Sequence, residues 1–193
     1  MLRVELASHA PHARKHGSTF AESWNSADGA TIVAAGAVLA GSDPNVVSDL
    51  LRTGARALVT SRKALATALG ALDRVVQRHA AEHRDDRLAA AAMLLAFTPD
   101  EHAVELAGAG QLHAYLIDGS GGFHPLHGGA GALGTGIEPA GVVRTVELRR
   151  DDLLVVATVP VARAWWDAGD RSAAALLRHA GARDASVALI AGG

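Results

Sequence analysis

The amino-acid sequence predicts an α+β fold, in which antiparallel strands form sheets and helices cover the faces of those sheets. The chain has 193 residues, 49% of them hydrophobic, so it can build a sizeable apolar core. Two expected helices follow one another directly, and a series of five or six short strands comes after them with brief turns between. Strands this close together pair as antiparallel neighbours, and helices grouped in sequence pack on the faces of such sheets.

Two strands are expected before the helices. The segment LRVELAS, residues 2–8, alternates apolar and polar side chains, which indicates a short strand. A loop that contains His and Gly follows at 9–17. Asp28-Gly29 is typical of a hairpin turn, and the apolar run ATIVAAGAVLAG, residues 30–41, is short enough to be a buried strand.

Two amphipathic helices come next. Ser42-Asp43-Pro44 combines a capping side chain with a proline near the first turn, which favours a helix start. Ser61 can cap the second helix, which is expected to run to about Glu82. Apolar side chains recur at helical spacing in both segments, so each helix presents one face to the core. These side chains are Val46, Val47, Leu50, Leu51, Ala55 and Leu58 in the first helix, and Leu65, Ala68, Leu69, Leu72, Val75 and Val76 in the second.

The remainder of the chain is mostly strand. Short apolar segments at 88–98, 102–110, 111–117 and 122–127 are divided by Pro- and Gly-rich turns. The segment VVRTVELRR, residues 142–150, alternates cleanly, and DDLLVVATV, residues 151–159, contains a buried run. Ser172 can start a last helix that ends near Gly181, and SVALIA, residues 186–191, is the closing strand.

Composition excludes several classes of function. The formal net charge is −2 and no basic block is present, so the charge pattern of a nucleic-acid-binding protein is absent. The chain has no cysteine, which excludes disulfides, thiolate catalysis and zinc sites made of Cys. Arg3, Glu5 and His9 interrupt the N-terminus, so it is not a signal peptide, and no apolar run reaches the roughly 18 residues of a membrane span. We therefore expect a cytoplasmic protein with no membrane partner.

The short motifs along the chain, taken in order, resemble those of one enzyme family. In that family a strand ends in a Gly-rich "NAGH" or "GVGN", and a hairpin, an "LG" loop, an alternating strand and "GDxLLLYTDGV" follow. The corresponding segments here are Ala107-Gly108-Ala109-Gly110, the hairpin around Asp118-Gly119, Leu133-Gly134, and 151–161. Gly17-Ser18 resembles the family's "GD", Val33-Ala34-Ala35-Gly36 its "VADG", and Arg183-Asp184-Ala185-Ser186-Val187 its closing "DDATV".

On these motifs the chain resembles the metal-dependent PPM (type 2C) protein phosphatases, in the bacterial branch that contains stage II sporulation protein E and the small RsbX-like regulators. The resemblance covers almost the whole chain, with matching length and element order. It implies a four-layer α-β-β-α sandwich of two antiparallel sheets flanked by helices, formed by a single domain over 1–193. It also implies two divalent ions, Mn²⁺ or Mg²⁺, that aspartates hold at strand ends and that activate a water for attack on phosphorus.

The sequence departs from the family at every metal-binding place. Ser18, Ala35 and Val159 stand where the resemblance puts the first three aspartates, and the fourth aligns with Arg183. Asp184 is the only carboxylate left nearby, and one carboxylate cannot hold two metal ions. The resemblance therefore predicts a phosphatase-like protein that is catalytically inactive and needs no cofactor.

Several functions stay open on the sequence alone. An inactive member can bind a phosphoprotein, such as a phosphorylated anti-sigma-factor antagonist, or a related kinase, with Arg183 as a phosphate-binding group. Alternatively, an active enzyme with Mn²⁺ or Mg²⁺ uses Asp184 with other carboxylates, drawn from Asp28, Asp43, Asp151 and Asp152. A third possibility is a dimerisation or scaffold module, in which the two long helices form the contact.

Two other features suggest contacts or metal binding. Trp165 and Trp166 are adjacent and point in different directions on a helix, so at most one is expected to be fully buried and the other is a candidate partner contact. His79-Ala-Ala-Glu82-His83 matches the H-x-x-E-H pattern of inverted zinc proteases, but a solvated helix end is the better interpretation. The His residues at 9, 12, 16, 113, 124 and 127 are interpreted as loop or surface residues, and the Gly-rich run 128–136 lacks the Lys of a phosphate-binding loop.

Overall fold

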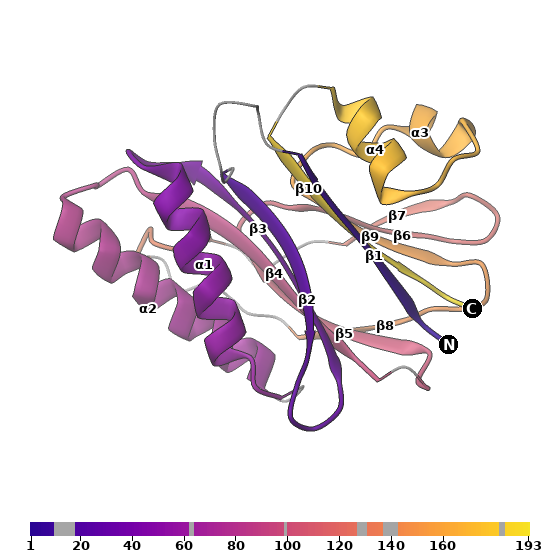
Figure 1. Ribbon diagram of the computed structural model, residues 1–193, viewed down its shortest axis with the longest axis horizontal. Helices are drawn as coiled ribbons and strands as arrows, with labels where there is room; N and C mark the ends of the chain where they lie inside the picture. Colours follow the sequence, from indigo (N-terminus) through magenta and orange to yellow (C-terminus); the bar gives the residue numbers. More distant parts are fainter. Residues whose placement is uncertain (10–17, 62–63, 99, 127–130, 137–142, 182–183) are drawn as a thin grey trace.

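The two β-sheets of the molecule pack face to face, with helices on both outer faces (Figure 1). The computed structural model describes residues 1–9, 18–61, 64–98, 100–126, 131–136, 143–181 and 184–193. The layer order is helix, sheet, sheet, helix. It confirms the α+β sandwich that the sequence and its resemblance predict.

The first sheet has the strand order β2–β3–β4–β5–β8, and each pair of neighbours is antiparallel. The two long helices α1 (Pro44–Leu58) and α2 (Leu65–His83) cover its outer face and share an apolar core with it. The strands are β2 (Thr19–Asn25), β3 (Thr31–Ala40), β4 (Ala89–Phe97), β5 (Ala103–Ala109) and β8 (Arg144–Glu147).

The second sheet has the order β1–β10–β9–β6–β7 and is also antiparallel throughout. Two short helices, α3 (Arg163–Asp167) and α4 (Ala173–Ala180), lie over its outer face, at the upper right of Figure 1. The strands are β1 (Arg3–His9), β6 (His113–Ile117), β7 (Phe123–Leu126), β9 (Leu153–Ala157) and β10 (Ala185–Ala191).

Strand β3 illustrates why the central strands read as continuous apolar runs. Val33 and Ala35 belong to the core between the sheets, whereas Ile32 and Ala34 belong to the core under α1 and α2. Because both faces of this strand are buried, no polar residue alternates with the apolar ones. The run 30–41 was expected to be a buried strand, and the structure confirms it.

The start signals of the helices agree with the structure in two cases of three. Asp43 accepts the N–H of Val46 at 3.3 Å and precedes Pro44 in α1, and Ser172 accepts the N–H of Ala175 at 3.1 Å in α4. The expectation for Ser61 is wrong, because α2 begins at Leu65 without a side-chain cap. Among the helices of the described ranges, none combines the length and apolar character that crossing a membrane requires.

The strand β2 has no counterpart in the sequence predictions, and the helix α3 was expected only as the helix that carries Trp165 and Trp166, without bounds. Along β2, Phe20 and Trp24 lie on the helix-facing side, but Glu22 stands between them on the same side and pairs with Arg52 of α1 at 3.1 Å. This ion pair breaks the apolar alternation that marks a strand. Helix α3 has only five residues, which is too short for a helical period to show.

Candidate functional site

One edge of the sandwich brings together the starts of β2 and β10 and the end of β9. Ser18 directly precedes β2, Asp184 directly precedes β10, and Thr158 directly follows β9. β10 lies against β2 and β3 across the sandwich. Residues far apart in the sequence therefore meet between the two sheets, and the resemblance places its metal ligands at these strand ends.

Asp184 is the centre of a hydrogen-bonded cluster there. Its carboxylate accepts the backbone N–H of Ser18 and the Ser18 hydroxyl, the latter at 2.8 Å. Its other oxygen accepts the hydroxyl of Thr19 at 2.9 Å. Three donors from the first sheet thus satisfy one carboxylate of the second sheet, so the contact ties the two sheets together.

Further hydroxyls extend this cluster into the second sheet. The Thr19 hydroxyl lies 3.0 Å from that of Ser186, which lies 2.9 Å from that of Ser8 on β1. The Thr158 hydroxyl accepts the N–H of Ser186 at 2.9 Å. Ser186 is fully buried, and its hydrogen bonds satisfy a polar side chain that would otherwise be costly inside the sandwich. We call Ser8, Ser18, Thr19, Thr158, Asp184 and Ser186 the hydroxyl cluster.

The other positions that the resemblance assigns to metal ligands are apolar. Ala35 is fully buried in the core between the sheets and pairs with Ala21, two residues beyond Thr19 along β2. Val159 is 6% exposed and belongs to the core between the second sheet and α3–α4. Its neighbour Thr158, not Val159, belongs to the hydroxyl cluster. Arg183, with His12, His16 and His127, lies outside the described residues.

The donor set between the sheets does not fit a dinuclear metal centre. Mn²⁺ and Mg²⁺ are bound by several carboxylate oxygens, and Asp184 is the single carboxylate of the hydroxyl cluster. Its lone pairs already accept three hydrogen bonds. Across the described parts of the chain, no group of three or more His, Cys, Asp or Glu side chains is arranged to hold a metal ion.

Three buried carboxylates elsewhere have structural partners. Asp152 accepts the N–H groups of Gly119 at 3.0 Å and Arg149 at 2.8 Å, at the start of β9. Asp73 of α2 accepts the N–H of Gly134 at 2.8 Å and so attaches the Leu133-Gly134 loop to the helix. Asp85 accepts the N–H of Ser42 at 2.6 Å, and this hydrogen bond is the main reason that its pKa is lowered.

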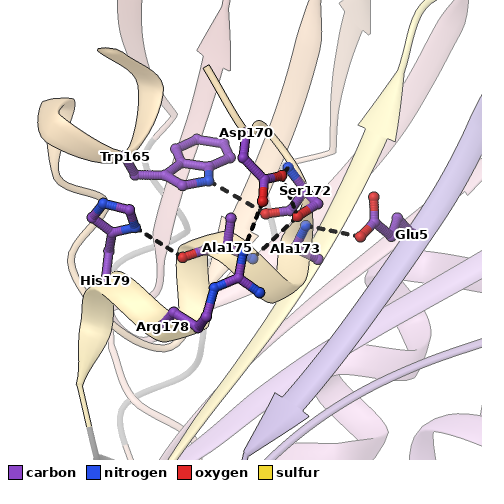
Figure 2. Close-up of polar contacts among 8 residues, drawn as sticks. All are labelled: Glu5, Trp165, Asp170, Ser172, Ala173, Ala175, Arg178 and His179. Carbon is purple, nitrogen blue, oxygen red and sulfur yellow. Dashed lines mark hydrogen bonds and ion pairs between the residues drawn. The ribbon is translucent and has the colours of Figure 1, made fainter. Parts of the chain in front are cut away.

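The exposure expected for the tryptophan pair is wrong. Trp165 is 0% exposed and Trp166 6%, because both rings pack in the core under α3 and α4. The Trp165 indole N–H donates to the carbonyl of Ser172 at 3.3 Å (Figure 2). Trp165 therefore offers no surface to a partner. Trp166 lines a cavity on the outer face of the second sheet.

The H-x-x-E-H pattern forms a helix end, as expected for a solvated face. The rings of His79 and His83 stack at 4.1 Å between centroids, and Nδ1 of His83 lies 2.9 Å from the carbonyl of His79. His124 pairs with Asp118 at 2.6 Å in the β6–β7 hairpin, and burial lowers the pKa of His113. The described residues supply no third ligand to the two stacked imidazoles.

Sequence reasoning missed four members of the hydroxyl cluster, namely Ser8, Thr19, Thr158 and Ser186. Each is a small hydroxyl residue inside or beside an apolar strand. A hydroxyl on a buried strand needs a partner, and four such residues at strand ends were a usable signal. What the sequence could not supply is that these ends meet on one side of the sandwich.

Comparison with known proteins gives one family and many similar folds. The model of the family "Stage II sporulation protein E (SpoIIE)" matches residues 40–186. No curated protein sequence matches the chain. Solved structures resemble it over nearly its full length at low identity, which shows the fold.

Three of these structures are representative. The S. agalactiae serine/threonine phosphatase has a TM-score of 0.83 at 11% identity, covering 100% of both chains. PppA, described as a key regulatory component of T6SS in Pseudomonas aeruginosa, has a TM-score of 0.73 at 17% identity, covering 98% of this chain and 96% of that chain. RsbX in complex with magnesium has a TM-score of 0.71 at 15% identity, covering 98% of both chains.

Proposed function

The chain belongs to the stage II sporulation protein E family, and we propose that it is a member without phosphatase chemistry that binds a protein partner in the cytoplasm. The whole chain, 1–193, acts as one phosphatase-like domain in this proposal. The partner is a phosphoprotein or another component of a partner-switching system, such as a phosphorylated anti-sigma-factor antagonist or its kinase. The observation that carries the proposal is the hydroxyl cluster around Asp184.

The hydroxyl cluster supports this proposal through its charge. A metal-activated water needs two divalent ions, and holding them takes negative charge from several carboxylates. Ser18, Thr19, Thr158 and Ser186 contribute neutral hydroxyls instead. The hydroxyls of Ser18 and Thr19, with the backbone N–H of Ser18, satisfy Asp184 without a cation. Ala35 leaves no acid on the neighbouring part of β3.

The positions of the other acids give little support to an active enzyme with a rearranged metal site. Asp28 lies in the β2–β3 turn, at the far end of β2 from Ser18 and roughly 20 Å along the strand. Asp43 caps α1. Asp151 and Asp152 precede β9, whereas Thr158 follows it, and Asp152 already accepts two backbone N–H groups. These carboxylates do not gather around Asp184.

Binding without turnover is the function that such a fold can retain. The relatives supply a context: PppA is described as a regulatory component, and the S. agalactiae protein as a serine/threonine phosphatase. Arg183 directly precedes Asp184 in the sequence, and a guanidinium there can hold a phosphate bidentately. We propose Arg183 as the phosphate-binding group. A phosphoserine then occupies the side of the sandwich where the family's metals bind.

The test combines turnover with binding. Hydrolysis of p-nitrophenyl phosphate and of a phosphoserine peptide is measured with Mn²⁺ and with Mg²⁺, in the wild type and in Asp184→Asn. We expect no turnover above buffer in either protein, but binding of the phosphoserine peptide to the wild type. Metal-dependent turnover that disappears in Asp184→Asn would overturn the proposal and support the active enzyme.

A matched pair of variants tests the phosphate-binding role. Arg183→Ala is expected to weaken binding of the phosphoserine peptide by about tenfold or more, because a charge-assisted bidentate contact is lost. Arg178→Ala, an arginine of α4 that pairs with Asp170, is the control and should leave that affinity unchanged. Equal affinity in wild type and Arg183→Ala would remove Arg183 from the site.

Homodimerisation through α1 and α2 stays a prediction, which sedimentation at several concentrations tests.

A further inference from the structure

The outer face of the second sheet contains a cavity of about 460 Å³ beside α3 and α4. The two short helices cover only part of this face (Figure 1). The residues that line the cavity come from the start of β1, the end of β10 and the start of β9, which are the strand ends nearest the chain termini. Leu153, Leu189 and the ring of Trp166 line it with apolar surface, and Arg3 and Arg171 line it with charge. A volume of this size and a mixed apolar and polar lining are typical of small-molecule sites.

The aromatic part of this cavity is rigid. Trp166 packs edge-to-face against Phe123 at 6.2 Å and against Trp165 at 6.2 Å between ring centroids. The guanidinium of Arg171 lies 3.6 Å above the centroid of the Trp166 ring. A guanidinium held over an aromatic ring by a cation–π contact still has N–H donors that can bind an anion. The contact with Trp166 thus places the Arg171 guanidinium beside the cavity before any ligand arrives.

The charged side chains around the cavity differ in whether they already have a partner. Neither Arg3 nor Arg171 has a carboxylate within ion-pair distance among the described residues. Two of the three acids in the lining, by contrast, are engaged with backbone amides. Asp152 accepts two backbone N–H groups, and Glu5 accepts the N–H of Ala173 at the start of α4 at 2.9 Å (Figure 2).

Asp151 is the third acid of the lining and limits the charge of a ligand. It is exposed and stands in the turn before β9 with a φ of 70°. A carboxylate at the rim disfavours a ligand with several negative charges, such as a nucleotide. A ligand with a single anionic group for the two arginines and an apolar body for Trp166, Leu153 and Leu189 matches this lining.

We propose that this cavity binds a small organic anion, with one carboxylate or similar anionic group attached to an apolar, ring-sized body. The anionic group binds the edge of the Arg171 guanidinium together with Arg3. The apolar body packs over Leu153 and Leu189 beside the Trp166 ring. This site lies on the outer face of the second sheet, away from the hydroxyl cluster between the sheets, so the proposal does not depend on the function proposed above.

The experiment uses naphthalene-2-carboxylate as the probe and the full chain labelled with ¹⁵N. The chain has three tryptophans, so three indole N–H signals are expected, and a Trp166→Phe variant assigns one of them. We expect the probe to shift the Trp166 signal with a Kd of about 1 mM or tighter, and to leave the Trp24 signal in place. The neutral naphthalene-2-carboxamide, which has the same shape, should bind at least about tenfold more weakly.

Variants of the two arginines separate the proposed site from general adsorption. Arg171→Gln and Arg3→Gln are each expected to weaken the probe by about threefold to tenfold, because each removes one charged contact. Arg163→Gln, whose guanidinium lies over Phe123 outside the cavity lining, is the control and should bind like the wild type. The indole signals of the unliganded variants show whether α3 and α4 remain packed.

Three results would overturn the proposal. One is the absence of a Trp166 shift at several millimolar probe. Another is equal binding of the carboxamide and the carboxylate, which would reduce the site to an apolar crevice. The third is a protein that binds a short peptide with a C-terminal Phe carboxylate but does not bind the naphthalene probe. That result would assign the cavity to the C-terminus of a protein partner.

Discussion

The two ends of strand β9 differ in whether they carry a buried carboxylate. At its start, Asp152 keeps a buried carboxylate, and the N–H groups of Gly119 and Arg149 satisfy it. At its end, the apolar Val159 stands where the resemblance expects an acid, and the hydroxyl of the preceding Thr158 belongs to the hydroxyl cluster. A carboxylate survives inside a protein only if hydrogen bonds or a cation compensate it. The chain keeps its acids where the backbone supplies that compensation, and lacks them where metal ions would have to.

Asp184 follows the same rule, because hydrogen-bond donors compensate its carboxylate too. It is the one acid left in the hydroxyl cluster, and two hydroxyls and one backbone N–H of the first sheet surround it. In the function proposed above, these neutral donors around a single charge stand where the resemblance places the family's metal ions. The comparison predicts that acids added between the sheets are costly, and that acids removed from backbone partners are costly too.

The largest expected effect comes from Ala35→Asp. This change puts a carboxylate at a fully buried position between the sheets, on the strand that pairs with β2, without a hydrogen-bond donor or a cation provided for it. We expect the free energy of unfolding to fall by about 3 kcal/mol or more. Urea denaturation with and without Mn²⁺ checks it. An unfolding free energy equal to that of the wild type without Mn²⁺ would contradict the comparison, because it would show that an acid added between the sheets needs no compensating cation or hydrogen bond.

Asp152→Ala comes next in size. The change leaves two backbone N–H groups without their acceptor, so the free energy of unfolding is expected to fall by about 2–3 kcal/mol. The neighbouring Asp151→Asn is the control, since Asn tolerates the positive φ and Asp151 is exposed. Its effect should stay within about 0.5 kcal/mol. If both variants unfold at the same urea concentration, the statement that Asp152 stabilises the fold through its two backbone partners is wrong.

Asp184→Ala is expected to cost about 1–2 kcal/mol, because its partners are only partly buried. Ser18→Ala should cost less, about 0.5–1 kcal/mol, since it removes one donor and leaves the backbone N–H in place. The double variant should cost less than the sum of the two. Exact additivity in urea denaturation would mean that the two side chains do not interact.

The smallest effect is in the pH dependence of stability. Hydrogen bonds from Ser120, then from His124, and from the N–H of Gly122 lower the pKa of Asp118 far below its ordinary value of 3.8. A group with a lowered folded pKa contributes stability above its unfolded pKa and loses it as the pH falls toward its folded pKa. Stability is therefore expected to decline below about pH 4, and Asp118→Asn should decline less steeply over that range. Parallel curves for the two proteins would be evidence against this role.

The sequence was sufficient for the architecture because its signals there are periodic and local. Asp43-Pro44 and Ser172 mark helix starts, and both faces of β3 are apolar because both are buried. The strand β2 was not predicted, because Glu22 interrupts its apolar side and pairs with Arg52. An ion pair between a strand and a helix leaves no local trace in a sequence.

The candidate site was only half accessible to sequence reasoning. The resemblance located Ser18, Ala35 and Asp184 as substituted or surviving positions. The contacts that fill the same place come from Thr19, Thr158 and Ser186, which join it only because the ends of β2, β9 and β10 meet. The burial of Trp166 was likewise missed. It depends on two rings that pack against the Trp166 indole, one from Phe123 of the β6–β7 hairpin and one from Trp165.

Calorimetric titration of the wild-type chain with Mn²⁺ tests the central claim most directly. The claim is that hydroxyls around Asp184 have replaced the family's metal-binding carboxylates. It predicts no saturable binding up to about 1 mM Mn²⁺, and the same flat titration for Asp184→Ala. Saturable binding of two ions per chain that is lost in Asp184→Ala would contradict the account.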